Sequence, residues 1–338
     1  MTGISGLLRG CRAVSRRRLV GSVCFAVLTV AAALLVGRRL THSSWPLDHV
    51  EPWLAVAAAL AYLASFFLRA RAWHRLFPPE ECPGQAGCLA SVGAAAASGA
   101  VLPFRLDYLI KVGVLRKLGG IRVGLGAIVL SIVSLGMIDA IAMLPLSISA
   151  TIATSSVMRG PLLVVVAFGI GCSTLLVLGR RLTGVRLLAR SRRLGALGDH
   201  VALHTSTAGR RDAIVAWFYL FACWSARAFG SAALLSALGL SFSPQTALTV
   251  ICLSAAAGII PITSGGAVVN AGVAAAILLA LGVAKDVAIN FSLASGLLLV
   301  ISAVAASLCG LLGTVAVRMA APRRAAHAGL GARADSGS

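Results

Sequence analysis

Residues 287–317, VAINFSLASGLLLVISAVAASLCGLLGTVAV, contain no charged side chain. A helix needs about 20 apolar residues to cross a hydrocarbon core of roughly 30 Å, so this stretch predicts a transmembrane helix. Further apolar stretches of this kind lie at about residues 19–36, 53–68, 124–150, 161–179 and 213–240. The first follows three arginines, but its length and the lack of a small-x-small cleavage site favour a retained span over a signal peptide. The sequence therefore predicts about six transmembrane helices.

The composition of the whole chain indicates that a bilayer is its solvent. The 338 residues are 59% apolar and only 12% charged, and the mean hydropathy is +0.94. So few polar side chains cannot cover a water-soluble protein. Because lipid offers no hydrogen bonds to the backbone, the spans are expected to be helical. The predicted fold class is an all-α integral membrane protein with a single polytopic domain over residues 19–317.

Basic residues are concentrated in alternate loops. The formal net charge is +20, and 25 of the 30 Lys and Arg residues precede the first span, lie within 69–122 or 180–211, or follow residue 317. By the positive-inside rule, residues 1–18 and a disordered tail at 318–338 both face the cytoplasm, in a cell (inner) membrane. Topology therefore accounts for the charge without a nucleic-acid partner. The basic surface is expected to attract lipids with anionic head groups.

Two apolar segments, at about residues 84–104 and 246–282, are broken by Gly and Pro. In each, small residues precede a Gly and then a Pro, at Gly99 and Pro103 in the first and at Gly258 and Pro261 in the second. This predicts re-entrant hairpins in an inverted repeat with halves at about 19–155 and 160–317, an arrangement that forms binding sites near mid-membrane. The alternative is that the small residues only permit close helix packing and that Pro only kinks a span.

The first break leads into charged residues. Pro103 is followed by Arg105, Asp107 and Lys111. Arg105 could hold a phosphate through two parallel hydrogen bonds. Asp107 and Lys111 are four residues apart, so they are expected to pair on a helix. The alternative is an interfacial helix whose cations reach out to water.

Asp139 and Arg227 are charges inside predicted spans. Such charges cost several kcal/mol unless they are paired or face water. Both lie about 15 residues from the cytoplasmic start of their spans, which places them at similar depth. We therefore expect them to pair or to share an aqueous cavity. A purely structural ion pair and a transport role are both open at this point.

The second break supplies a further candidate for anion binding. Two consecutive glycines allow a backbone turn whose amides, with the following helix N-terminus, could hold an anion. The residues singled out here are Pro261, Ser264, Gly265, Gly266 and Asn270. Motifs for serine hydrolases, zinc proteases, nucleotide phosphates and metal-bound nucleotide sugars are absent from the sequence. No cofactor, metal site or catalytic residue is therefore predicted, and an enzyme is the less favoured class.

The chain resembles the flippase-like transmembrane region of lysylphosphatidylglycerol synthases over roughly residues 19–317. The resemblance is carried by Arg69-Ala-Arg71-Ala-Trp73, by Leu102-Pro103 with Arg105, Asp107 and Lys111, by Asp139, by 261–266 and by Gly282-Val283. It implies movement of an anionic lipid between leaflets. The chain departs from the family pattern at Leu106, Leu135, Ser264 and Asn270. The chain ends about 20 residues after its last predicted span, so lysyl transfer is not expected and a lipid-modifying enzyme would be encoded separately.

The leading hypothesis is a flippase or carrier for an anionic phospholipid or a polyprenyl-phosphate-linked lipid. Arg105 and Lys111 would hold the head group, Asp107 and Asp139 would position them, and the break at 261–270 would complete the site. One alternative is a membrane glycosyltransferase with a polyprenyl-phosphate donor and Asp107 as base. The other is a non-catalytic membrane scaffold. A homo-oligomer is compatible with all three.

Overall fold

The structure is a computed structural model that describes residues 51–100, 102, 106–118, 123–154, 156–182, 210–241, 243–257 and 267–334. Every regular element within these ranges is helical, so the predicted all-α class is confirmed. Residues His49–Ser338 form one compact unit. The predicted N-terminal segment at 1–18 and the predicted first span at 19–36 lie outside the described residues.

Five segments of the described chain are long and apolar enough to cross a membrane. They are formed by α3 (Pro52–Arg75), α6 (Leu125–Ala142) continued by α7 (Leu144–Ala153), α8 (Ser156–Leu182), α10 (Arg210–Ala237) and α13 (Lys285–Ala334). Each matches one of the apolar stretches predicted between residues 53 and 317. The break between α6 and α7 lies just before Pro145, whose missing N–H cannot continue the hydrogen-bond ladder.

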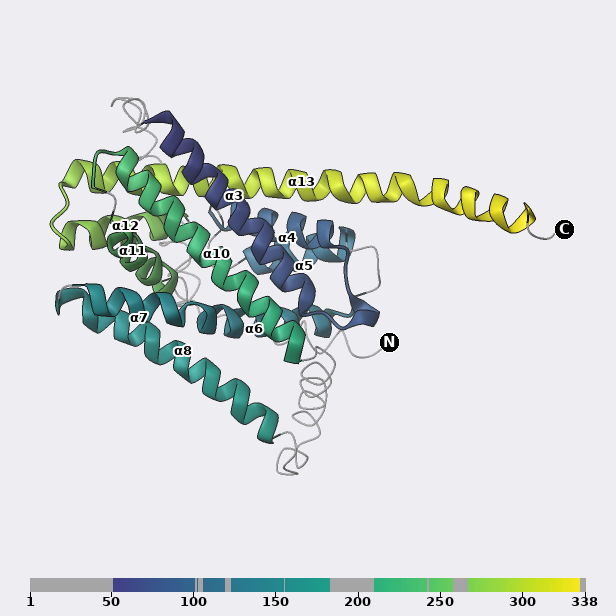
Figure 1. Ribbon diagram of the computed structural model, residues 1–338, viewed down its shortest axis with the longest axis horizontal. Coiled ribbons are helices and arrows are strands. Elements are labelled where there is room, and N and C mark those ends of the chain that lie inside the picture. The colour runs from purple at the N-terminus through teal and green to yellow at the C-terminus, as the bar shows by residue number, and fades with distance from the viewer. Residues whose placement is uncertain are drawn as a thin grey trace, which may run out of the picture. The chain divides into compact units, whose positions relative to one another are not determined.

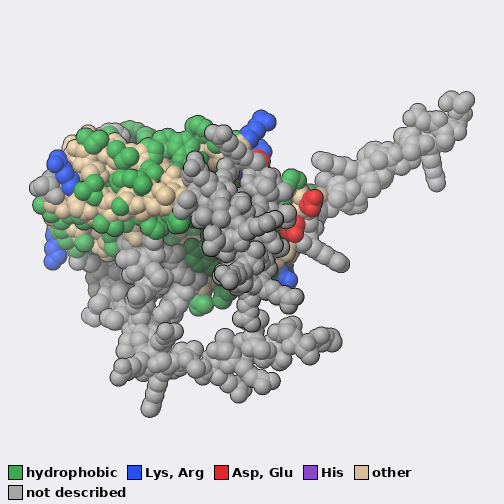
Figure 2. Space-filling model, turned by 90° about the horizontal axis from the view of Figure 1, so that it is seen from below, with side chains coloured by type: hydrophobic (Ala, Val, Ile, Leu, Met, Phe, Trp, Pro, Cys, Tyr) green, Lys and Arg blue, Asp and Glu red, His purple; other side chains and the backbone are tan. Residues whose placement is uncertain are grey.

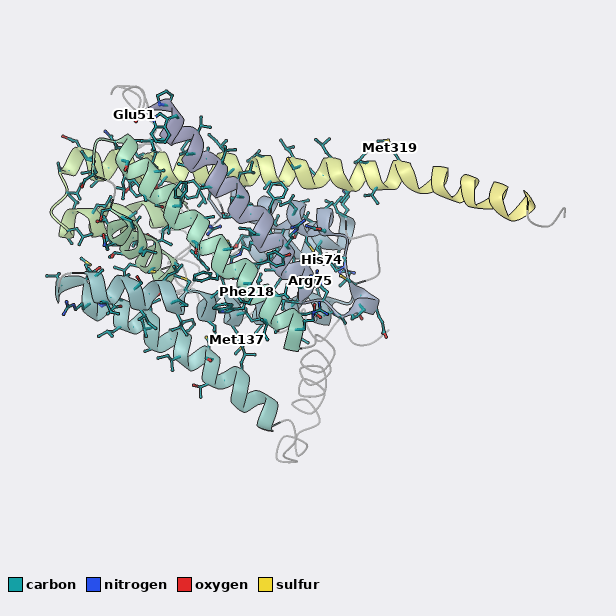
Figure 3. The ribbon with its side chains drawn as sticks, in the orientation of Figure 1. Glu51, His74, Arg75, Met137, Phe218 and Met319 are labelled. Carbon is teal, nitrogen blue, oxygen red and sulfur yellow. The ribbon has the colours of Figure 1, made fainter. Side chains whose placement is uncertain are left out.

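The surface of these spans is apolar, as expected for a protein solvated by lipid. Large apolar side chains are exposed along them, among them Leu60, Val164, Phe229 and Leu308. Figure 2 shows apolar side chains over the described surface, with charged side chains gathered toward its ends. Figure 3 shows Glu51 and Arg75 at opposite ends of α3. A band of exposed apolar residues between polar ends is what a bilayer requires.

The two broken segments are built from short helices (Figure 1). The first contains α4 (Gln85–Gly99), and α5 (Asp107–Leu118) follows it; a 3₁₀ turn, η2 (Pro79–Glu81), precedes them. The second contains α11 (Pro244–Ala257) and α12 (Ala267–Ala280). Helices of 15, 12, 14 and 14 residues are about 18–23 Å long, which is too short for a hydrocarbon core of roughly 30 Å. α4 packs on α5 and α11 on α12; that the two segments are re-entrant hairpins of an inverted repeat stays a prediction.

One short helix of each broken segment packs against a span from the other half of the chain. α4 lies along α13, α11 contacts α7, and α3 and α10 pack along each other. The α4–α13 contact depends on glycine: a Cβ on Gly93 would lie 2.5 Å from the Ala303 carbonyl oxygen, and one on Gly310 would overlap the backbone of Ala90. Helix packing through small residues is typical of membrane interiors, where it lets backbones approach closely.

Two details differ from the expectations. Residues 318–334, in the tail that the sequence predicts to be disordered, continue α13 as a helix, in a segment rich in alanine, the best helix former. Tryptophans near the ends of spans commonly anchor them at the membrane interface, but Trp73, near the end of α3, is fully buried. Its indole Nε1 donates a 2.9 Å hydrogen bond to Ser131 Oγ, so it joins α3 to α6.

Candidate functional site

A cavity of about 630 Å³ lies inside the helical unit. Its lining comes from α3, α5, α6, α8, α10, α11, α12 and α13, and most of that lining is apolar. Its charged lining residues, within the described part of the chain, are Arg69, Asp139 and Arg227. Two guanidinium groups and one carboxylate leave one positive charge in this apolar surrounding.

Arg69 and Asp139 form an ion pair across α3 and α6. The Arg69 Nη2 to Asp139 Oδ2 distance is 2.6 Å, and the side chains are 22% and 13% exposed. Trp224 on α10 donates from Nε1 to the other carboxylate oxygen at 2.7 Å. Asp139 is thus held on both oxygens. Its charge is matched by Arg69, and three spans are fixed to one another at this point.

Arg227 on α10 has a different environment. Its Nε donates to Ser65 Oγ at 3.1 Å, and its guanidinium carbon lies 5.5 Å from the Phe66 ring centroid and 5.1 Å from that of Trp224. Ring faces attract a cation without neutralising it. Among the described residues, no carboxylate forms an ion pair with Arg227. Its Nη groups therefore remain available to an anion in the cavity.

Buried hydroxyl groups fix the wall that carries Arg227. Tyr62 Oη and Ser231 Oγ are 2.9 Å apart and join α3 to α10. Ser65, which is fully buried, donates to the Tyr62 carbonyl oxygen at 2.7 Å and accepts from Arg227. Gly230 allows this approach, since a Cβ there would lie 3.2 Å from the Ala58 carbonyl oxygen. The small residues of the α3–α10 interface therefore bring the two arginines to one cavity.

The sequence predicts that Asp139 and Arg227 either pair or share a cavity. In the structure both residues line one cavity, while Asp139 pairs with Arg69; that this cavity is aqueous stays a prediction. The ion pair forms with Arg69 because α3, not α10, presents a guanidinium to the Asp139 carboxylate.

Asp107 and Lys111 occupy α5 as predicted but do not form a direct ion pair; the ion pairs between described residues are Arg69–Asp139 and Arg75–Asp212. Lys111 is only 8% exposed, and its Nζ lies 4.1 Å from the Trp73 ring centroid. Asp107 packs beside Gly99, where an added Cβ would lie 3.3 Å from the Asp107 Cβ. Neither residue lines the cavity, whereas the neighbouring Tyr108 does.

Several predicted site residues lie outside the described residues: Pro103, Arg105, Pro261, Ser264, Gly265 and Gly266. The backbone of Asn270 belongs to α12, but its side chain also lies outside the description. Ala271 and Ala274, in the next turn of α12, line the cavity. The second broken segment therefore reaches the cavity through both of its helices, since Val250 and Ser254 of α11 also line it.

Arg69 and Trp224 were not predicted as site residues. Arg69 was counted among the cations of a cytoplasmic loop, although it lies six residues before the end of α3, about 9 Å inside the helix. That depth, and its place in the Arg69-Ala-Arg71-Ala-Trp73 motif, were the available signals. Within the described residues, no group of three or more His, Cys, Asp or Glu side chains could hold a metal ion.

Taken together, the cavity presents guanidinium donors within a largely apolar lining, which suits a ligand with an anionic group and an apolar body. No curated protein and no solved structure shows a significant match to the chain. The family described as the lysylphosphatidylglycerol synthase TM region matches residues 25–307, most of the chain's length. The chain therefore belongs to the lysylphosphatidylglycerol synthase transmembrane-region family, which relates its function to membrane lipids.

Proposed function

We propose that this protein moves an anionic lipid between the leaflets of a cell membrane. The lipid is a phospholipid or a polyprenyl-phosphate-linked lipid, and its head group enters the cavity while its apolar tails stay in the bilayer. Family membership supports a lipid as the substrate. The cavity supports a carrier as the class of protein. No cofactor is needed for this step.

The observation that carries the proposal is the environment of Arg227. A cation inside a membrane span is costly unless it is paired or solvated, and Arg227 has only a serine oxygen and two ring faces as described partners. A phosphate in the cavity would accept from both Nη groups and supply the missing negative charge. Arg69 is a weaker candidate because Asp139 already holds it.

The surroundings of the cavity fit a diffusible lipid. Its lining includes apolar residues of α8, α11, α12 and α13, such as Phe168, Val250 and Leu299. We propose that the residues predicted from the first break, with Arg105 foremost, receive the head group before it reaches Arg227. That step gives Arg105 the role of an entry residue.

The membrane setting belongs to the same proposal. The distribution of Lys and Arg supports an inner membrane location with both termini in the cytoplasm. The partners are lipids with anionic head groups, a separately encoded lipid-modifying enzyme that supplies or consumes the lipid, and a second copy of the chain.

The test is lipid scrambling in proteoliposomes, with head-group-labelled phosphatidylglycerol and a labelled polyprenyl phosphate as probes. Wild-type protein should move at least one probe faster than empty liposomes. Arg227→Ala should slow that movement roughly tenfold or more, since hydrogen bonds to charged groups contribute about 1.5–3 kcal/mol each.

Arg75→Ala is the matched control, because Arg75 is a half-exposed cation at the end of α3. It should move lipid at the wild-type rate. Unchanged movement in Arg227→Ala, or no movement by the wild type with either probe, would contradict the proposal.

A further inference from the structure

A second hollow lies on the outside of the helical unit, apart from the cavity of Arg227. It has a volume of about 490 Å³ and lies between the end of α3, the start of α4, the end of α5 and α13. This volume is within the range of about 300–1,000 Å³ that small-molecule sites occupy. Among its lining residues are Phe67, Gly84, Ala86, Gly313 and Val317.

Within the described part of the chain, this groove opens on the surface of two membrane spans. Two of the helices that form it, α3 and α13, are membrane spans, and its rim includes Phe67 at 39% and Val317 at 68% exposure. Its wall is shaped by small residues: a Cβ on Gly313 would lie 3.1 Å from the Ala86 Cβ. In a bilayer, an apolar groove of this kind is in contact with acyl chains.

One end of the groove lies next to a cation and a helix N-terminus. Arg71 is exposed and lies one turn beyond Phe67 on the same face of α3. The first turn of α4 also lies in the groove. Its N-cap residue is Gly84, which has no side chain that could cap the helix. The free N–H groups at a helix N-terminus favour negative charge. The nearby Glu81 carboxylate keeps its charge but is held toward the start of α6, where it accepts a hydrogen bond from the Gly124 N–H at 3.2 Å.

We propose that this groove binds a bilayer phospholipid, with an acyl chain between α3 and α13 and an anionic phosphate beside Arg71 and the first turn of α4. The lipid at this site is a bound partner and not the transported molecule. The proposal therefore does not depend on the movement of lipid through the cavity.

The test is native mass spectrometry of the full chain in detergent, with added phosphatidylglycerol or phosphatidylcholine of identical acyl chains. It is run in the wild type and in an Arg227→Ala background, so that binding in the cavity is separated from binding in the groove. Arg71→Gln should weaken phosphatidylglycerol adducts about fivefold, as expected for one cation near a head group, and leave phosphatidylcholine adducts unchanged. Val317→Trp, which fills the groove from its exposed rim, should reduce both.

Two matched controls should bind as the wild type does. Lys285→Gln removes an exposed cation at the start of α13, and Val315→Trp adds the same bulk at a half-exposed position of α13 outside the groove. Thermal unfolding of each variant in detergent checks that it is folded. Equal adducts in Arg71→Gln and the wild type would overturn the head-group assignment. Loss of a dimer in Val317→Trp with unchanged lipid adducts would assign the groove to a second copy of the chain instead.

Discussion

Two arginines line the same cavity and are held in opposite ways. Arg69 forms a 2.6 Å ion pair with Asp139, whereas Arg227 donates to a serine oxygen at 3.1 Å. Trp224 stands between them, 5.9 Å from the Arg69 guanidinium and 5.1 Å from that of Arg227. The tryptophan also donates to Asp139, so its polar edge completes one site and its ring supports the other.

This difference gives the two arginines different roles. The charge of Arg69 is structural, whereas the charge of Arg227 is available to a ligand. In the Arg69–Asp139 pair each charge balances the other, and the pair ties α3 to α6 within the membrane-spanning part of the protein, where an unpaired charge is costly. Arg227 carries a charge that no described carboxylate balances. The contact between α3 and α6 therefore contributes a closed ion pair that stabilises the fold, while α10 contributes an open cation that can bind a ligand.

The largest expected effect comes from breaking the closed pair. Asp139→Ala leaves the Arg69 guanidinium without its carboxylate and the Trp224 N–H without its acceptor. We expect the free energy of unfolding in detergent to fall by about 3 kcal/mol, which is the lower end of the range for a broken buried pair because the cavity leaves this one partly exposed. Denaturant unfolding followed by circular dichroism measures it.

Asp212→Ala is the control for this substitution. Asp212 pairs with Arg75 at 3.6 Å, with the side chains 38% and 52% exposed, and exposed pairs contribute at most about 1 kcal/mol. If both substitutions lower the free energy of unfolding equally, the Arg69–Asp139 pair does not stabilise the fold more than an exposed ion pair does.

A smaller effect is expected when both partners of the closed pair are replaced by apolar residues. The double variant Arg69→Met/Asp139→Leu removes the uncompensated charge and should recover about 1–2 kcal/mol relative to Asp139→Ala, because a buried ion pair can be exchanged for apolar side chains at little net cost. It should also keep measurable lipid movement, since Arg227 is unchanged. Stability recovered together with complete loss of movement would place the closed pair in the transport step.

The fold could be predicted from the sequence because lipid constrains each span separately, through the length and hydropathy of a continuous stretch of residues. Each span must satisfy its own backbone and be apolar over a fixed length, so hydropathy located the spans that contain α3, α6, α8, α10 and α13. Asp139 and Arg227 were found for the same reason, since a charge inside such a run needs an explanation.

The partners of these charges could not be predicted in this way. Asp139 meets Arg69 from 70 residues away and Trp224 from 85, and only the packing of α3, α6 and α10 decides that choice. The spacing rule for helices predicted a pair between Asp107 and Lys111, but the Trp73 ring offers Lys111 a contact on another helix. Sequence spacing describes one helix at a time, whereas these contacts join several helices.

The smallest expected effect concerns the orientation of Arg227. Ser65→Ala removes the acceptor of its Nε and should lower stability by about 1 kcal/mol. Lipid movement should fall severalfold, because a guanidinium that is free to turn presents its Nη groups less often to the phosphate. Ser131→Ala provides the matched comparison: Ser131 is also buried and also accepts a side-chain N–H, that of Trp73. It should cost similar stability and leave lipid movement unchanged. Equal slowing by the two substitutions would mean that movement follows overall stability and not the geometry of Arg227.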